Sequence, residues 1–459
     1  MQPQRGGLVV VANRLPVAWD DIADRWAPSP GGLVSALAPI LVDRRGAWVG
    51  WPGIADREEE PFRLEGIRQV PVTISAEEFT DYYEGFCNGT IWPLYHDAIR
   101  PVEMHRHWWR PYVVVNQRFA DAVISETAVD EPVWVQDYQL QLVPAMLRAA
   151  TPDRRIGFFL HIPFPPVEIF GRLPWRREII AGLLGADVIG FHTRQSARNF
   201  ARAARVFSTA TGPAGQLSWQ GRTITVESVP ISIDTAEFKA LAGSPEIADA
   251  AVRFRRELGS PRHLMLGVDR LDYTKGIDLR LRAFQTVLER RPDLRGQVTF
   301  VQVAVPSRAG VEEYQIIRDQ IELLVGRING EFGRRDWVPV HYLHRSLARE
   351  ELVAYYRAAD VMVITPLRDG MNLVAKEYIA CRVDGTGVLV LSEFAGAAEQ
   401  LDRALVVNPY DLDGLADTIE RAIELGAGEQ RDRMRYLRRA VTRWDVYGWA
   451  ERCLDSVLG

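Results

Sequence analysis

The chain has 459 residues, of which 47% are hydrophobic and 25% charged, and its formal net charge is −5 at neutral pH. This length is too great for one hydrophobic core and predicts two or three domains, in a composition typical of soluble globular proteins. The negative charge argues against general nucleic-acid binding, and no apolar run approaches the roughly 20 residues that cross a bilayer.

Only three cysteines occur, Cys87, Cys381 and Cys453, and none belongs to a C-x-x-C pair. This usage is typical of a reducing compartment and offers no thiolate metal site. The N-terminal residues lead directly into a strand pattern without the features of a signal peptide. We therefore expect a cytoplasmic protein whose partners include no nucleic acid and no membrane.

The first half of the chain alternates short aliphatic segments with amphipathic segments. The aliphatic segments predict strands at residues 8–12, 133–135, 156–161 and 188–191. The amphipathic segments predict helices at residues 33–42, 142–150, 177–184 and 193–207. A polar stretch with hairpin character, residues 212–222, then leads to a linker near residues 229–234.

The second half repeats this alternation. Strands are predicted at residues 263–268, 298–305, 338–343, 361–365, 387–391 and 404–407. Helices are predicted at residues 277–290, 312–329, 349–358, 373–382 and 412–425. Strands rich in Val and Ile that alternate with helices indicate parallel sheets covered on both faces.

The alternation predicts an α/β protein with two doubly wound, Rossmann-like domains that face each other across a cleft. We expect an N-terminal domain at residues 1–232, a C-terminal domain at 233–445, and a last helix at 446–459 that packs back onto the first domain. Ligands of such sheets bind beyond the carboxyl ends of the strands. The turns at those ends are therefore the candidate site.

Four strand ends and helix starts in the first half carry candidate residues: Arg14, the pair Gly31–Gly32, Asp137 and His161. A histidine at a strand end is more often a hydrogen-bonded structural residue than a catalytic one. The glycine pair allows close backbone approach to a ligand, but it lacks the G-x-G-x-x-G of a dinucleotide site. A nearby aromatic cluster is interpreted as core, and the alternative is that it forms the stacking walls of a sugar site: Tyr82, Tyr83, Phe86 and Trp92.

The segment from Gly267 to Gly276 lies between a predicted strand and a predicted helix, and it carries Arg270 and Lys275. Two cations beside a helix N-terminus suit a pyrophosphate, because a guanidinium pairs with it bidentately and an ammonium acts as a point charge. The alternative is a surface turn in which Asp269 and Asp272 neutralise these cations. No Walker motif occurs.

The most informative segment runs from Thr365 to Glu377 and joins a strand to a helix through a polar turn. Such a helix start presents free N–H groups and the positive end of the helix dipole, which suits an anion. Glu377 lies about one turn further along the helix. The segment indicates a site for a phosphorylated, hydroxyl-rich ligand, and the alternative is an ordinary turn capped by Asp369 or Asn372.

Together these residues resemble trehalose-6-phosphate synthases, which are retaining glucosyltransferases with two Rossmann domains of the GT-B type. The matching blocks follow one another nearly from end to end: 13–16, 31–33, 48–51, 82–93, 137, 161–165, 270–276, 302–308, 326–330 and 368–377. The resemblance implies transfer of glucose with retention from UDP- or GDP-glucose to glucose 6-phosphate. It leaves the oligomeric state open, in a family that is often dimeric or tetrameric.

For the nucleotide-sugar donor, the resemblance implies a site with separate contacts to pyrophosphate, glucose and ribose. Arg270 and Lys275 would hold the pyrophosphate, and Glu377 the ribose. The glucose hydroxyls would contact the side chain of Asp369 and the backbone of the next residues, Gly370, Met371 and Asn372. Further backbone groups would approach the phosphates, at Gly31, Gly32, Leu373 and Val374.

For the acceptor, the resemblance implies three residues that bind the phosphate of glucose 6-phosphate: Arg14, Tyr83 and Arg308. Three more would shape the pocket: Trp48, Trp92 and Asp137. His161 would lie beside the donor glucose at the reacting face. Gln136 and Gln139 flank Asp137 where the family commonly has histidines, which leaves the proton-bearing neighbour of Asp137 open.

Retention could use a nucleophilic carboxylate, but no carboxylate stands out for that role. The resemblance implies instead a front-face route, in which the leaving diphosphate accepts the proton of the incoming hydroxyl. Arg270, Lys275 and the helix start would stabilise the developing charge, with His161, Asp137 and Asp369 as the other catalytic residues. No metal or other cofactor is expected, and the D-x-D at residues 411–413 is interpreted as a helix cap.

Other functions stay open from the sequence. A relative with the same fold could use another acceptor or a pseudosugar, as in glucosylglycerol-phosphate synthesis or C7-cyclitol coupling. A non-catalytic sensor of sugar phosphate would lack Arg270, Lys275 or Asp369, and all three are present. The nucleobase pocket is expected near residues 343–347, and it leaves UDP and GDP undecided.

Overall fold

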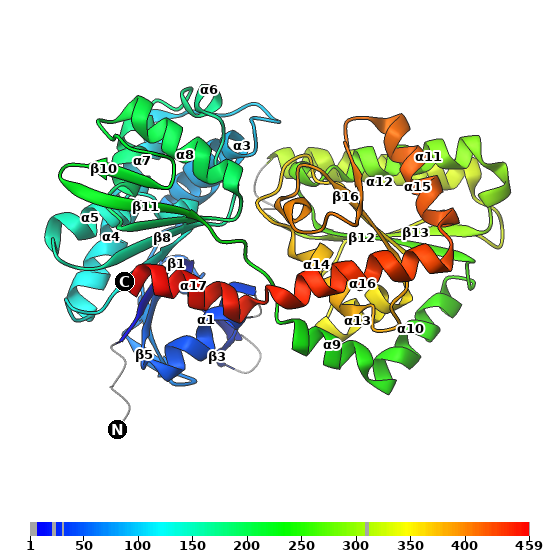
Figure 1. Cartoon of the computed structure of the whole chain (residues 1–459), viewed down its shortest axis with the longest axis horizontal. Helices are drawn as coiled ribbons and strands as arrows, with labels where there is room; N and C mark the ends of the chain where they lie inside the picture. Colours follow the sequence, from blue (N-terminus) through cyan, green and yellow to red (C-terminus); the bar gives the residue numbers. More distant parts are fainter. Residues whose placement is uncertain (1–6, 21–23, 30–31, 308–311, 459) are drawn as a thin grey trace. The chain divides into compact units, whose positions relative to one another are not determined.

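The computed structural model describes residues 7–20, 24–29, 32–307 and 312–458. The chain divides into two compact units (Figure 1). Unit 1 comprises Met1–Pro230 and Tyr447–Gly459, and unit 2 comprises Ile231–Val446. The helices of the described residues are all too short or too polar to span a bilayer.

Unit 1 contains a nine-stranded sheet in the order β10-β11-β9-β8-β7-β1-β4-β6-β5. Its parallel strands are β1 (Val9–Arg14), β4 (Ala47–Trp51), β6 (Ile67–Pro71), β7 (Val133–Gln136), β8 (Ile156–Leu160), β9 (Val188–Phe191) and β11 (Arg222–Ser228). Antiparallel strands form both edges, β5 (Phe62–Leu64) and β10 (Gln216–Trp219). A separate hairpin pairs β2 (Val17–Asp20) with β3 (Arg25–Pro28).

The sheet of unit 1 is covered by helices that the sequence predicted only in part. The helical elements are α1 (Gly32–Asp43), α2 (Ala76–Glu78), the π-helix η1 (Phe79–Ile91), α3 (Trp92–Tyr95), α4 (Arg106–Glu126), η2 (Tyr138–Leu140), α5 (Val143–Ala150), α6 (Val167–Phe170), α7 (Arg176–Leu183), α8 (Arg194–Phe207) and α17 (Val446–Leu458). Among these, η1, α4 and the short elements α2, α3, η2 and α6 have no counterpart in the sequence prediction. The expected core role is confirmed for three aromatic residues, which are at most 4% exposed: Tyr82, Phe86 and Trp92.

The C-terminal helix α17 packs on β7 and β8 of unit 1. The Trp449 ring is fully buried and lies 5.4 Å from the Trp134 ring and 5.3 Å from the Phe159 ring, between centroids. A Cβ at Gly157 would lie 2.4 Å from Val457 Cγ2, so the glycine permits the close approach of the helix.

Unit 2 contains a six-stranded parallel sheet in the order β14-β13-β12-β15-β16-β17. Its strands are β12 (His263–Arg270), β13 (Val298–Val305), β14 (Val340–Leu343), β15 (Val361–Ile364), β16 (Val388–Ser392) and β17 (Leu405–Val407). Counted along the chain, this order is 3-2-1-4-5-6, that of the doubly wound nucleotide-binding fold. The parallel strands of unit 1 begin with the same order, β6-β4-β1-β7-β8-β9. The doubly wound α/β class expected from the sequence is confirmed in each unit.

The helices of unit 2 complete the βα repeats. They are α9 (Thr235–Gly243), α10 (Pro245–Glu257), η3 (Tyr273–Lys275), α11 (Ile277–Arg290), η4 (Pro292–Leu294), α12 (Glu312–Phe332), α13 (Arg349–Ala358), α14 (Leu373–Cys381), η5 (Gly396–Glu399), α15 (Leu412–Glu424) and α16 (Ala427–Arg443). The sequence prediction lacked α9, α10 and α16, and also the short elements η3, η4 and η5. Asp411 caps α15 by accepting from Gly414 N (3.0 Å), as expected for the D-x-D.

A buried polar network joins three strands of unit 2 at their carboxyl ends. The Arg280 side chain is fully buried, and its guanidinium lies 2.6 Å from Asp269 Oδ2, 2.9 Å from Gln302 Oε1 and 2.9 Å from Thr365 Oγ1. A Cβ at Gly267 would lie 2.3 Å from Gln302 Oε1, so this network needs a glycine there. Asp269 is therefore the partner of Arg280, and its expected alternative role, neutralising Arg270 or Lys275, is wrong.

Candidate active site

The order reverses between β12 and β15 in unit 2 and between β1 and β7 in unit 1. In open α/β sheets the crevice at such a reversal is the usual ligand site. In unit 2 the loops there carry Lys275 and Asp369, and in unit 1 β1 ends at Arg14 while Asp137 follows β7 directly. The topology thus brings the candidate residues of each unit to its switch point.

The loops that follow β12 and β15 are bonded to each other. Leu367 N donates to Thr274 O (2.7 Å), and Lys275 Nζ lies 2.7 Å from Asp369 Oδ2. Gly276 has φ +61°, and a Cβ there would lie 2.5 Å from Thr365 O. Only glycine both adopts this conformation readily and leaves room for the second loop.

The ion pair between Lys275 and Asp369 is largely shielded from water. The side chains are 10% and 14% exposed, so salt screens their attraction less than that of a surface pair. Asn372 Nδ2 donates to the same carboxylate oxygen of Asp369 (3.2 Å). An ammonium has three donors, and only one of those of Lys275 is needed for Asp369.

A third loop, which follows β16, holds the backbone of the second. Asp369 N donates to Phe394 O (3.1 Å), and Gly396 N donates to Asp369 O (3.2 Å). Ala397 N donates to Met371 O (2.7 Å). This loop is not among the candidates predicted from the sequence, although Gly396 shortly after an aliphatic strand is a signal that marks such loops.

The start of α14 is capped and still presents free donors. Asn372 adopts φ 79°, and its Oδ1 accepts from Ala375 N (3.1 Å). Asn372 therefore caps the helix, as one alternative from the sequence predicted, and Asp369 does not. The first residues of the helix, Leu373 and Val374, have no intrahelical acceptor for their N–H groups, which suits an anion at this end.

Two ionisable residues of α14 are held by their surroundings. Burial raises the pKa of Glu377, and the hydrogen bond from Tyr356 to its Oε2 (2.8 Å) partly offsets that rise. Lys376 Nζ donates to Ile231 O and to Gln400 Oε1, both at 2.7 Å, and burial lowers its pKa to about 7. Lys376 thus anchors α14 to other segments of unit 2. Arg270, at the end of β12, is exposed.

In unit 1, Arg14 is exposed at the end of β1 and is held at its backbone and its guanidinium. Trp48 Nε1 donates to Arg14 O (3.0 Å), and the Arg14 Cζ lies 4.8 Å from the centroid of the Trp51 ring. Trp48 is only 1% exposed, so it would influence a ligand through Arg14 rather than by contact. Gly53, with φ +91°, leaves room for the guanidinium, because a Cβ there would lie 2.0 Å from Arg14 Nη2. The sequence analysis missed Gly53.

The π-helix η1 presents Tyr83 beside Arg14. Desolvation lowers the pKa of Arg14, and its interaction with Tyr83 opposes that shift, which reflects their proximity. The Tyr83 ring stacks on the Phe79 ring with centroids 5.2 Å apart. π-Helical turns often occur at functional sites. Trp92, just beyond η1, contacts the Tyr138 ring at 5.7 Å between centroids.

Asp137 and His161 form a connected pair at the ends of β7 and β8. Asp137 has φ +73°, an unusual conformation that clusters at functional sites, and its Oδ1 accepts from His161 N (3.1 Å). Gln136 Nε2 donates to Trp134 O (3.4 Å), which directs its Oε1 to His161 Nε2 (3.0 Å). The neutral His161 ring therefore carries its proton on Nε2 and leaves Nδ1 as an acceptor.

Aromatic rings surround His161 and keep it neutral. The ring lies 4.9 Å from the Phe159 ring, 5.2 Å from the His192 ring and 6.0 Å from the Trp449 ring, between centroids. Burial in this environment lowers the pKa of His161 to about 3. At neutral pH, His161 is thus a hydrogen-bonding group and not a cation.

For three of the expected site residues the structure gives little or no information. Gly31 and Arg308 lie outside the described residues, and Gly32 is the first residue of α1. Within the described residues, no group of three His, Cys, Asp or Glu side chains is arranged to hold a metal ion.

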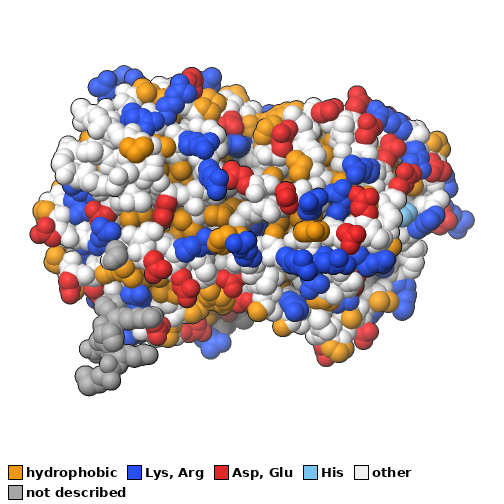
Figure 2. Space-filling model, in the orientation of Figure 1, with side chains coloured by type: hydrophobic (Ala, Val, Ile, Leu, Met, Phe, Trp, Pro, Cys, Tyr) orange, Lys and Arg blue, Asp and Glu red, His pale blue; other side chains and the backbone are white. Residues whose placement is uncertain are grey.

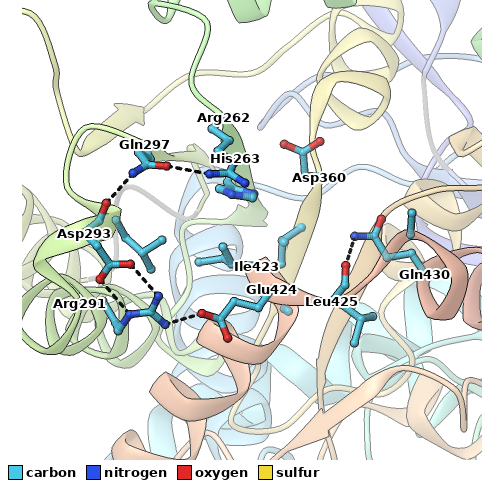
Figure 3. Close-up of a pocket in the computed structure, with 14 residues that line it drawn as sticks. Arg262, His263, Arg291, Asp293, Gln297, Asp360, Ile423, Glu424, Leu425 and Gln430 are labelled. Atoms are coloured by element: carbon cyan, nitrogen blue, oxygen red, sulfur yellow. Dashed lines mark hydrogen bonds and ion pairs between the residues drawn. The ribbon is translucent and has the colours of Figure 1, made fainter.

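A cavity of ≈ 660 Å³ in unit 2 lies away from these candidates, at the amino ends of β12 and β15 (Figure 3). Arg291 pairs with two carboxylates of the lining, at 2.7 Å from Asp293 Oδ2 and 2.6 Å from Glu424 Oε1. Arg262 Nη1 donates to Gln297 Oε1 (3.3 Å). None of the candidate donor residues lines this cavity.

Comparison with known proteins matches residues 6–458 to the model for glycosyltransferase family 20. The chain is 53% identical over 461 residues to a trehalose-6-phosphate synthase of Mycolicibacterium smegmatis, across 98% of this chain and 92% of that protein. A protein of the same name from Mycobacterium avium is 52% identical, with 98% and 94% covered.

The chain is also similar to solved structures of trehalose-phosphate synthases. A UDP-forming α,α-trehalose-phosphate synthase from Burkholderia xenovorans, in complex with glucose-6-phosphate, is 36% identical with a TM-score of 0.91, over 99% of this chain and 100% of that chain. A structure from E. coli bound with UDP-2-fluoro glucose is 34% identical with a TM-score of 0.91, over 98% and 99%.

The hydrogen bond between Gln136 and His161 predicts how a charge at residue 136 changes the ring. In Gln136→Glu, a carboxylate would face the ring and stabilise the imidazolium, so the pKa of His161 should rise from about 3 towards its ordinary value. Histidine NMR titration of the full chain measures this pKa, with the His161→Gln variant assigning the signal.

The matched control is Gln139→Glu, which adds the same charge on the other side of Asp137. A clearly smaller rise is expected there. Equal rises in both variants would contradict the specific contact between Gln136 and His161.

Proposed function

We propose that this chain, which belongs to glycosyltransferase family 20, is an α,α-trehalose-6-phosphate synthase. It transfers glucose with retention from a nucleoside-diphosphate glucose, UDP- or GDP-glucose, to glucose 6-phosphate. The names of the similar proteins and the ligands of the similar structures support this function. The observation that carries it is the ion pair of Lys275 with Asp369 at the switch point of unit 2.

In this proposal the donor binds to the strand-end loops of unit 2. Lys275, with donors left after its bond to Asp369, and the exposed Arg270 bind the diphosphate. The N–H groups of Leu373 and Val374 add the positive end of the helix dipole. Asp369 accepts from glucose hydroxyls, together with the backbone of residues 370–372.

The remaining donor and acceptor residues have roles that the sequence resemblance implies. Glu377 accepts from the ribose, and its contact with Tyr356 fixes its direction. Arg14 and Tyr83 bind the acceptor phosphate with Arg308, while Gly31 and Gly32 approach the donor phosphates. Trp48, Trp92 and Asp137 shape the pocket from the positions described above.

The proposed reaction takes place on one face of the glucose ring. The bond from the anomeric carbon to the diphosphate oxygen breaks, and a bond to the acceptor hydroxyl oxygen forms on the same face. The hydroxyl proton passes to the departing diphosphate oxygen. Arg270, Lys275 and the start of α14 supply the charge that stabilises this leaving group, and we propose that no metal ion is required.

The neutral His161 positions the donor glucose by hydrogen bonding in this proposal. Because its proton lies on Nε2 and faces Gln136, Nδ1 is the atom that would accept from a sugar hydroxyl. The three described cysteines are free and buried, which suits the reducing environment of the cytoplasm, and the substrates are small molecules.

The function predicts turnover with defined substrates. Purified full-length protein, treated with EDTA, should release nucleoside diphosphate from UDP- or GDP-glucose only when glucose 6-phosphate is present. NMR of the product should show two α-anomeric protons, because the donor configuration is retained. Absence of turnover with every donor would contradict the proposal, and turnover only with another acceptor would assign a related synthase.

The space at Gly53 predicts a separate effect on the acceptor. In Gly53→Ala the new methyl group would displace the Arg14 guanidinium, so the KM for glucose 6-phosphate should rise at least about tenfold, the scale of one lost charge-assisted hydrogen bond. The KM for the donor should change much less. Steady-state kinetics with each substrate varied measures both values.

The matched control is Gly66→Ala in the same unit. Gly66 also has a positive φ, +82°, but a Cβ there would contact only the Val42 methyl groups, at 3.6 Å. This variant should share the backbone strain without the rise in acceptor KM. Equal effects in both variants would show that strain, and not displacement of Arg14, is responsible.

A further inference from the structure

We propose that a basic groove between α9 and α16 of unit 2 binds a compact anion that carries several phosphate groups. The groove has a volume of ≈ 760 Å³. Six basic side chains line it: Lys239, Arg431, Arg435, Arg438, Arg439 and Arg443. None of its lining residues is acidic, although the whole chain has a net charge of −5.

Helical spacing gathers the arginines on one face of α16. Five arginines share this face and extend over about 18 Å of helix: Arg431, Arg435, Arg438, Arg439 and Arg443. Figure 2 shows a row of Lys and Arg side chains along α16. The other face of the helix is anchored in unit 2 by three buried residues: Met434, Leu437 and Val441. The basic side chains therefore extend from a fixed backbone.

Within the described part of the chain, these six basic side chains have little ionic compensation. Only Arg435 has an ion pair, with Asp432 at 3.3 Å, and the two side chains are 59% and 66% exposed. Such a pair contributes at most about 1 kcal/mol. The cavity in Figure 3 differs in this respect, because the guanidinium of Arg291 pairs there with two carboxylates of the lining, Asp293 and Glu424.

Helix stability alone does not account for this arrangement. Cations in the last turns of α16 interact favourably with the helix dipole, which can explain Arg439 and Arg443. Arg431 lies in the first half of the helix and Arg435 at its middle, and like charges four residues apart repel each other. A bound anion would remove this repulsion.

The lining favours a compact oligophosphate over a larger polyanion. The groove has a second wall, formed by Thr235 and Lys239 of α9, whereas a membrane or a nucleic-acid duplex needs an open face. The hydroxyls of Thr235 and Thr442 add uncharged donors that suit phosphate oxygens. A longer polyanion would extend beyond the groove onto a protein of net negative charge.

This groove is distinct from the proposed donor site. Gly385 in its lining follows the C-terminal end of α14, whereas the donor residues lie at the start of that helix. Both α9 and α16 contact α14.

The test is calorimetric titration of the full chain with inorganic tripolyphosphate at low ionic strength. We expect one saturable site whose affinity falls with added salt. In the double variant Arg435→Glu/Arg439→Glu the affinity should fall at least tenfold, and it should fall less in Arg435→Gln/Arg439→Gln. Circular dichroism checks that each variant is folded.

The matched control is Arg256→Glu/Arg282→Glu, which changes the net charge equally at two exposed arginines of unit 2 outside the groove. Its affinity should stay within about twofold. Lys275→Met should also retain binding, because the active site is not involved. Failure of wild-type binding, an equal loss in the control, or loss in Lys275→Met would overturn the proposal. Tighter binding of duplex DNA or of phosphatidylglycerol vesicles, lost in the groove variant, would overturn the choice of a compact ligand.

Discussion

The ion pair between Lys275 and Asp369 joins two loops that are 94 residues apart in the sequence. Because β12 and β15 are parallel neighbours at the switch point of unit 2, their following loops meet at one edge of the sheet. The pair holds a cation and a carboxylate beside the start of α14, where backbone donors are available. In the proposed function, the donor contacts of Lys275, Asp369 and the start of α14 depend on this meeting of loops.

A buried hydrogen-bond network in unit 2 holds the loops that carry this ion pair. Arg280 is fully buried and bonds Asp269 of β12, Gln302 of β13 and Thr365 directly after β15. Removing one partner of such a buried charge typically costs about 3 to 5 kcal/mol, so this buried network holds the loops in register. In unit 1 single hydrogen bonds hold the candidate residues in place. The indole of Trp48 donates to Arg14 O, and the backbone N–H of His161 donates to Asp137.

Local patterns in the sequence predicted most of the parallel strands, the α/β class and the polar turns, because each depends on residues close together along the chain. They did not predict β4 or β6. They did not predict α4, whose helix contains Pro111 and buries the polar Asn116, or the π-helix η1, whose hydrogen bonding no simple periodicity marks. Arg14 lies close to Gly53, and Gln136 is hydrogen-bonded to His161. The fold brings these residues together, so local sequence patterns do not predict either contact. Asn372 combines a cap with a place in the candidate site, so the two alternatives for that turn were not exclusive.

In the proposed function, Lys275 is oriented by Asp369 and binds the diphosphate of the donor. The most direct measurement is the affinity of the wild type and of Lys275→Met for the nucleoside diphosphate released in turnover and for the matching monophosphate, by calorimetry. The substitution should weaken binding of the diphosphate at least tenfold, the scale of a lost charge-assisted contact, and binding of the monophosphate far less. An unchanged diphosphate affinity, or an equal loss for both nucleotides, would contradict this role of Lys275.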